Sequence, residues 1–174
     1  MTLSLLVSAC SGATKARATS APLRPGFPAG HSLDDKNVQN GSTFQLNGTD
    51  IGQTYRFSFP IFKNTSKSPI IVTSVRLVHV PADVQVLGYP EFTITSDSGY
   101  PLDQRFDFPG SAPEPLSFSG PIVVAPGERS PHFFMVAVRL RQATRETMRG
   151  CAVAYTQRDT QFEQQMSCQF ALTP

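Results

Sequence analysis

Two stretches near the C-terminus decide the fold: Cys151-Ala-Val-Ala-Tyr155 and Phe162-Glu-Gln-Gln-Met-Ser-Cys168-Gln-Phe-Ala-Leu172. The second alternates mainly apolar and polar residues, and the first alternates larger side chains with alanine. A period of two places alternate side chains on one face of a β-strand. The polar segment Arg158-Asp-Thr-Gln161 lies between them and has the composition of a turn. The sequence therefore predicts a C-terminal β-hairpin with a four-residue loop at 158–161.

The same period-two pattern recurs upstream. Residues 55–61 and 132–140 alternate, shorter apolar runs occupy 84–87, 92–95 and 122–124, and a β-branched run fills 69–80. The long run is apolar on both faces, which predicts a central strand. Pro60 lacks an N–H for a sheet ladder, so its strand is expected at an edge or at a bulge.

Seven to nine short strands, with turn signals about every ten residues, predict an all-β fold. The expected architecture is an antiparallel β-sandwich of the immunoglobulin-like or fibronectin-like kind that ends in the hairpin. One segment, residues 142–148, is expected to be helical over about two turns. A length of 174 residues fits one domain. The 40% hydrophobic content can supply its core, and charged residues at 16%, against a usual share of about 25%, exclude a disordered or coiled-coil chain.

The N-terminus predicts a membrane anchor. The apolar run that starts at Met1 ends in Val7-Ser8-Ala9-Cys10, which resembles a bacterial lipobox. In lipoproteins the thiol of this cysteine receives diacylglycerol, and cleavage before it makes it the new N-terminus. Cys10 is therefore the expected lipidation site, and residues 1–9 are the expected remnant of a lipoprotein signal. The alternative is a frayed apolar N-terminus with an ordinary cysteine.

A flexible tether is expected between this anchor and the domain. Fifteen of the twenty residues 11–30 are Ala, Pro, Gly, Ser or Thr, a composition that cannot form a core. We expect the tether to span residues 10–41 and to hold the domain ~30 Å from the membrane. The β-sandwich domain is then expected over residues 42–174.

The two remaining cysteines lie on the predicted hairpin. With a four-residue loop at 158–161, Cys151 is directly opposite Cys168, at a separation near the range of a disulfide. We expect a disulfide between them, as is common in exported domains. Two buried thiols and a metal pair are the alternatives.

No motif for catalysis, a cofactor or a metal is found in the sequence. We therefore expect a protein that is not an enzyme and needs no cofactor. The alternative is an extracytoplasmic hydrolase whose site is assembled from distant residues, with Asp103, Asp107 or His79 contributing. The net charge of +2 is too small to indicate a nucleic-acid partner.

Two surfaces are candidates for binding. The first is the long segment 97–120, whose aromatic residues would suit a protein partner in the envelope. Its expected contacts are Tyr100, Phe106 and Phe108. The second is a cluster of cations that would suit an anionic wall polymer or lipid headgroups. Its members are Arg139, Arg141, Arg145 and Arg149. A flap over the sandwich and a solvated charged face are the respective alternatives, and the protein partner is favoured.

As a whole, the chain resembles the small lipoproteins of actinobacterial type from high-GC Gram-positive bacteria. The resemblance rests on the lipobox, the tether and the cysteine hairpin. It also rests on the strand opening at 62–65, which precedes the apolar run 69–72, and on the eleven Arg against four Lys. It implies a lipid-anchored protein with an immunoglobulin-like domain at the extracytoplasmic face of the cell membrane. The expected function is a binding or structural module.

Overall fold

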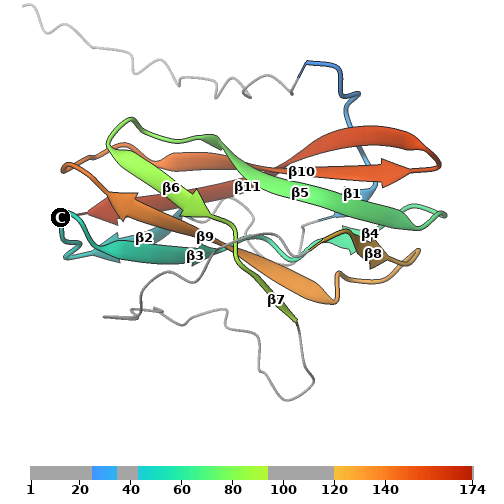
Figure 1. Cartoon of the computed structure of the whole chain (residues 1–174), viewed down its shortest axis with the longest axis horizontal. Helices are drawn as coiled ribbons and strands as arrows, with labels where there is room; N and C mark the ends of the chain where they lie inside the picture. Colours follow the sequence, from blue (N-terminus) through green and yellow to red (C-terminus); the bar gives the residue numbers. More distant parts are fainter. Residues whose placement is uncertain (1–24, 35–42, 94–119, 174) are drawn as a thin grey trace, which may run out of the picture.

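The computed structural model describes residues 25–34, 43–93 and 120–173, and within them the chain is a β-sandwich with no helix (Figure 1). None of the described residues forms a helix that could cross a membrane. The strands are β1 (Leu33–Asp34), β2 (Thr43–Asn47), β3 (Thr54–Ser58), β4 (Lys63–Asn64), β5 (Ile70–His79), β6 (Val84–Gly88), β7 (Glu91–Thr93), β8 (Ile122–Val124), β9 (His132–Leu140), β10 (Met148–Gln157) and β11 (Thr160–Thr173).

Two sheets form the layers of the sandwich. One has the strand order β2-β11-β10-β5-β8, and the other has the order β3-β9-β6, with β7 also paired to β9. The short strands β1 and β4 form a separate pair. The larger sheet is mixed, because β2 runs parallel to β11 while its other pairs are antiparallel. The nine strands other than the two-residue β1 and β4 agree with the seven to nine expected.

The hydrophobic pattern explains the position of the strands. β3 is an edge strand that ends at Ser58, before Pro60, as the missing N–H of proline requires. β5 is internal, between β10 and β8. Its burial nevertheless alternates, with Ile70 and Val72 in the core and Ile71 exposed. One face of β5 is thus buried, although both faces carry apolar residues.

The core lies between the two sheets. Alternate residues of β9 point into it, as predicted, and Phe57 of β3 contacts Phe170 of β11 with ring centroids 4.9 Å apart. The most deeply buried large side chains are Tyr155, Phe59, Phe62, Phe134, Phe170, Ile70, Leu140 and Met148.

The C-terminal hairpin has a different register from the expected one. Its turn contains two residues, Arg158 and Asp159, which both have positive φ (46° and 66°), rather than four. Consequently Cys151 is opposite Met166, not Cys168. The register then shifts between Arg149 and Cys151, and this bulge allows the Cys151–Cys168 disulfide to form with a Cα–Cα distance of 5.7 Å. The expected disulfide is confirmed, whereas the expected loop length is wrong.

The expected helix at 142–148 is also wrong. These residues form an irregular connection from β9 to β10, and Met148 already belongs to β10 and is buried. Thr144 is buried, and its hydroxyl accepts a hydrogen bond from the Glu146 N–H at 3.1 Å. Such a local bond competes with helical hydrogen bonding. In addition, a helix of two turns has little stability of its own.

The N-terminal segment 28–34, which we call the strap, packs on the domain. Gly30 N–H donates to the carbonyl of Glu163 at 2.9 Å, and Glu163 N–H donates to the carbonyl of Pro28 at 3.1 Å. Leu33 is buried in the core. The strap lies inside the range 10–41 expected as a tether, so the packed domain begins earlier than residue 42. Cys10 and the remainder of that range outside 25–34 are not among the described residues.

Candidate binding hollow at the hairpin end

Several of the predicted site residues lie outside the residues that the structure describes. These are Cys10, Tyr100, Phe106, Phe108, Asp103 and Asp107. His79, the third residue weighed for catalysis, is at the exposed end of β5, with its Nε2 3.9 Å from Glu146 Oε2.

The four predicted arginines belong to one end of the sandwich, which we call the arginine end, but to different sheets. Leu140 and Met148 fill the core, so their neighbours Arg139 of β9 and Arg149 of β10 face outward from opposite layers. Arg141 and Arg145 lie on the exposed connection between these strands. The set is therefore divided between two outer faces of the molecule.

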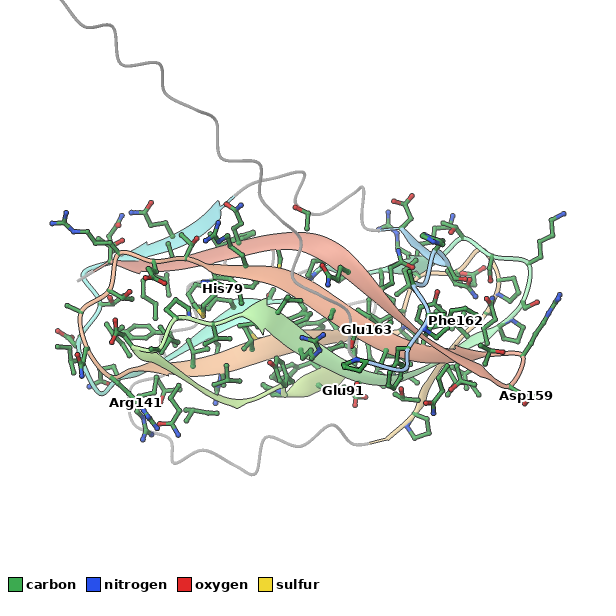
Figure 2. All side chains as sticks on the ribbon, turned by 90° about the horizontal axis from the view of Figure 1, so that it is seen from above. His79, Glu91, Arg141, Asp159, Phe162 and Glu163 are labelled. Carbon is green, nitrogen blue, oxygen red and sulfur yellow. A yellow bond between two sulfur atoms is a disulfide. The ribbon has the colours of Figure 1, made fainter. Side chains whose placement is uncertain are left out.

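The opposite end of the sandwich carries a hollow of about 330 Å³. Figure 2 shows Asp159 and Phe162 at this end, which we call the hairpin end, and Arg141 at the other. Residues 66–68, which precede β5, form one wall. The β10–β11 hairpin forms the other wall with Gln157, Arg158, Thr160 and Phe162.

A buried asparagine fixes the first wall. Asn64 is fully buried, and its Oδ1 accepts hydrogen bonds from the Ser66 N–H at 3.0 Å and from the Ser66 hydroxyl at 2.7 Å. Its Nδ2 donates to the carbonyls of Ser68 at 2.9 Å and Val124 at 3.0 Å. Because all of its amide capacity is used, Asn64 holds the turn before β5 in one conformation.

Side chains of the hairpin tie the two walls together. Gln157 Nε2 donates to Ser66 Oγ at 2.6 Å, and Gln157 Oε1 accepts from Ser32 Oγ of the strap at 3.0 Å. Arg158 Nε donates to Ser68 Oγ at 2.9 Å. The hollow therefore has walls positioned by hydrogen bonds from three separate segments of the chain.

Phe162 provides an aromatic surface in the hollow, and Tyr155 supports it from behind. The two rings stack with centroids 5.6 Å apart and planes inclined by 26°. The Tyr155 hydroxyl accepts a hydrogen bond from the Ser32 N–H at 3.1 Å. A Cβ at Gly30 would overlap this hydroxyl, so only glycine allows the strap to approach the ring so closely.

The strap is further held by a side chain of β11. Gln164 accepts from the Leu33 N–H at 3.0 Å and donates to the Leu33 carbonyl at 2.6 Å, so its amide replaces a missing strand partner. Together with the backbone bonds to Glu163, this amide anchors the strap beside the aromatic wall.

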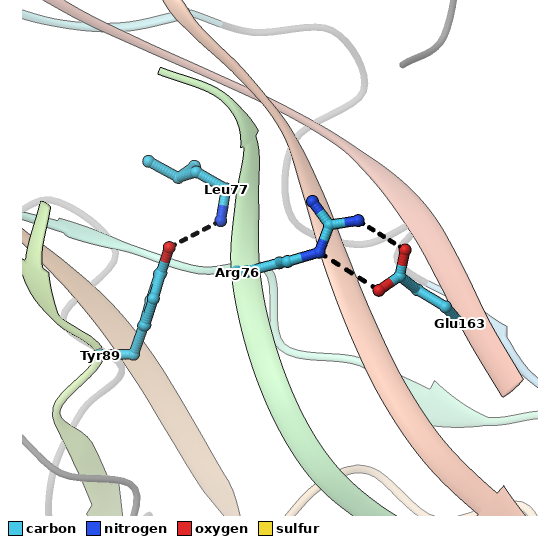
Figure 3. Close-up of polar contacts among 4 residues, drawn as sticks. All are labelled: Arg76, Leu77, Tyr89 and Glu163. Atoms are coloured by element: carbon cyan, nitrogen blue, oxygen red, sulfur yellow. Dashed lines mark hydrogen bonds and ion pairs between the residues drawn. The ribbon is translucent and has the colours of Figure 1, made fainter. Parts of the chain in front are cut away.

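A buried ion pair fixes the hairpin from the outer face of the larger sheet. Glu163 has 1% of its side chain exposed, and its carboxylate accepts from Arg76 Nη2 at 2.6 Å and Nε at 3.2 Å (Figure 3). Ala154 of β10 lies directly opposite Glu163, and its small side chain leaves room for the two longer ones to meet. Bidentate pairing of this kind fixes orientation as well as distance.

The charge of the hollow is positive. Among its lining residues Lys67 and Arg158 are cations and none is a carboxylate. Arg158 uses its Nε for Ser68, and its terminal nitrogens make no hydrogen bond or ion pair within the described part of the chain. Serine and threonine hydroxyls supply further donors and acceptors. This arrangement can bind an anion that also carries a flat apolar face.

A second buried polar contact joins β7 to β9. His132 Nδ1 lies 2.6 Å from Glu91 Oε1, and the glutamate side chain is 8% exposed. Ser130 is the serine nearest to His132 in sequence. Its hydroxyl donates to the backbone carbonyl of His132 at 2.7 Å and not to the imidazole. Within the described ranges, no group of three His, Cys, Asp or Glu side chains could hold a metal ion.

The sequence did not reveal the hollow, because its walls come from positions about 90 residues apart. One local signal was present. Two-residue hairpin turns with positive φ favour Asn-Gly or Asp-Gly, whereas this turn has Arg158 followed by Asp159. A cation at such a position could have marked the turn as functional.

Comparison with known proteins identifies no family. No protein-family model matches the chain, and no curated protein matches it. The solved structure of the Vibrio cholerae VesB protease is similar over 80% of this chain and 31% of that chain, with a TM-score of 0.35 and 14% sequence identity. The chain thus spans about a third of the length of that protein.

Proposed function

We propose that this protein is a lipid-anchored, non-catalytic binding module at the extracytoplasmic face of the cell membrane. The observation that carries the proposal is the hollow at the hairpin end, whose walls are fixed by Asn64, Gln157 and Arg158. Preorganised polar groups of this kind are typical of binding sites on rigid scaffolds. The ligand would be a component of the envelope, either an anionic wall polymer or a protein.

Two features support the location. The Cys151–Cys168 disulfide is typical of proteins that fold in an oxidising compartment. The lipobox residues Val7-Ser8-Ala9-Cys10 would supply the anchor. An immunoglobulin-like domain, as the resemblance implies, would then be held close to the membrane by the chain that precedes the strap.

The competing function is an extracytoplasmic hydrolase. The Glu91–His132 contact favours it, since a carboxylate that orients an imidazole is one part of many hydrolytic sites. However, the described residues place no nucleophile on that imidazole, because the Ser130 hydroxyl bonds to a backbone carbonyl. The binding function therefore has the stronger support.

The test compares the wild-type protein with Cys10→Ala in cells that express the complete gene. We expect the wild type in the membrane fraction with an acyl label and the variant in the soluble fraction. The soluble variant should then co-sediment with isolated envelope fragments, and it should not hydrolyse ester, peptide or glycoside substrates. Retention of the variant in the membrane would contradict the anchor. A failure to sediment would contradict the binding function.

A further inference from the structure

We infer that the hollow at the hairpin end binds one anionic sugar unit, a hexose that carries a carboxylate or a phosphate. The inference rests on the proposed binding function and names its ligand class. Three properties of the hollow carry it: the charge of its lining, the backbone conformation of Arg158 and the aromatic ring of Phe162.

The charge of the lining selects an anion. Lys67 and Arg158 come from two different turns and line the same hollow, while no carboxylate is among its lining residues. Two cations around one space repel each other until a negative group lies between them. Arg158 is oriented by its bond to Ser68, and a guanidinium held in this way can donate in parallel to a carboxylate or a phosphate.

The backbone of Arg158 supports a functional role for its side chain. Its φ of 46° lies in the left-handed region, where glycine and asparagine are the favoured residues. An arginine at this position is less favourable for the turn itself. Strained conformations of this kind are concentrated at binding sites, where the side chain does what the favoured residue cannot. Here the arginine brings a cation to the rim of the hollow.

The ring of Phe162 selects a sugar rather than a bare anion. A hexose has one face of C–H groups and a rim of hydroxyls, so it matches a site with one aromatic wall and several polar groups. Phe162 is such a wall, and the stacked Tyr155 ring keeps it in place. Ser68 and Thr160 provide hydroxyls around it, while the Ser66 hydroxyl is used by Asn64 and Gln157.

The size of the hollow limits the ligand. A volume of about 330 Å³ is at the lower end of the range of ligand pockets, ~300 to 1,000 Å³, so it would accommodate a single sugar unit, either free or at one point of a polymer. The hollow is open to the surface of the hairpin end, which permits a polymer to continue beyond the bound unit.

The test uses the full chain with Cys10→Ala, labelled with ¹⁵N, and follows the amide signals during titration. The probes are glucuronic acid, galacturonic acid, glucose 6-phosphate, glucose and inorganic phosphate. We expect at least one of the charged sugars to shift the amides of 66–68 and 157–162. Glucose and inorganic phosphate should bind about tenfold more weakly, because each lacks one of the two recognised features.

Three variants test the assignment. Arg158→Asn removes the cation but introduces a residue that suits the left-handed turn. It should weaken binding of the charged sugar about tenfold. Phe162→Leu keeps an apolar side chain and should reduce the preference for the sugar over inorganic phosphate. Arg145→Gln, the matched control, removes the same charge at the arginine end and should leave the affinity unchanged.

Some results would overturn the inference. Equal affinities for inorganic phosphate and the charged sugars would show a simple anion site without recognition of a ring. Loss of binding in Arg145→Gln but not in Arg158→Asn would place the site at the arginine end. If no probe binds while the protein still sediments with envelope fragments, this inference fails and the proposed binding function stands. If neither occurs, both fail.

Discussion

At the hairpin end, cations lie beside a hydrogen-bonded hollow, whereas at the arginine end they are divided between an irregular connection and the ends of two strands. Arg158 is held by Ser68, and the turn behind it is held by the fully buried Asn64. At the arginine end, by contrast, Arg145 is exposed, and Arg141 contacts Gln85 at 3.3 Å on the surface. Both ends carry cations, but the hairpin end has the fixed geometry that specific binding requires.

The same comparison separates two kinds of charge. The Arg76–Glu163 pair that supports the hairpin is shielded from water, with side chains 19% and 1% exposed. His79 and Glu146 of the arginine end are 46% and 69% exposed and 3.9 Å apart. Exposed pairs contribute little to stability, while removal of one member of a buried pair is costly.

The largest effect is expected for Arg76→Leu. It removes the bidentate partner of the buried Glu163 carboxylate and should lower the free energy of unfolding by about 3 kcal/mol. Urea denaturation would measure the loss. Arg149→Leu, an exposed arginine on the neighbouring strand, is the control and should change stability by less than ~0.5 kcal/mol.

The double variant Arg76→Leu/Glu163→Leu sharpens this prediction. It removes both charges, so most of the lost stability should return. Equal losses in Arg76→Leu and Arg149→Leu would show that the hairpin end does not depend on this ion pair.

A similar loss is expected when the disulfide is removed. The two cysteines are 17 residues apart in sequence, and opening a loop of this size should cost ~3 kcal/mol of stability. The variant Cys151→Ala/Cys168→Ala can be compared with reduced wild type by thermal unfolding. Since the bond lies within the sheet between the two ends, both ends should unfold together at the lower temperature. Two alkylatable thiols in the exported wild type would contradict the pairing.

A smaller effect is expected for Gly30→Ala. The new Cβ would overlap the Tyr155 hydroxyl, and overpacking of this kind costs about 2 kcal/mol. The strap should then detach first, which limited proteolysis near residue 30 would detect. His31→Ala changes an exposed neighbour and should have no effect.

Tyr155→Phe combined with Gly30→Ala should recover only part of the lost stability, because it removes the overlapping oxygen but leaves the ring carbons Cζ and Cε1 at 2.8 and 2.9 Å from the new Cβ. If the strap behaves as a flexible tether instead, Gly30→Ala will be as stable as the wild type.

The smallest effects are expected for single arginines at the two ends. Arg158→Asn relieves a left-handed conformation and should stabilise the protein by ~0.5 kcal/mol, since its bond to Ser68 is exposed. Arg145→Gln should change stability by less than ~0.5 kcal/mol in either direction. Parallel urea titrations would compare them. A clear destabilisation by Arg158→Asn would mean that this arginine is needed for the fold rather than for a ligand.

Local patterns in the sequence determined the strands and the faces that they bury. Alternation predicted β9 and its inward residues Phe134 and Leu140, and Pro60 predicted the end of an edge strand. The composition of the cysteine hairpin predicted the disulfide, because two strands joined by a short turn must bring nearby residues together. Successive side chains of a strand point to opposite faces of the sheet, so the order of apolar and polar residues shows directly which face is buried.

Only the tertiary structure decided the register of the hairpin, the strap and the hollow. The register followed from a two-residue turn and a bulge. Shortening the loop from four residues to two moves the pairing by two positions, which keeps every side chain on its face and so cannot be read from an alternating pattern. The strap contains too few apolar residues to indicate packing. Leu33 becomes buried in the tertiary structure, where the Gln164 side chain of β11 bonds to its N–H and its carbonyl. The hollow requires Ser66 and Gln157 to meet across 91 positions, a contact that arises only when β5 pairs with β10 in the larger sheet.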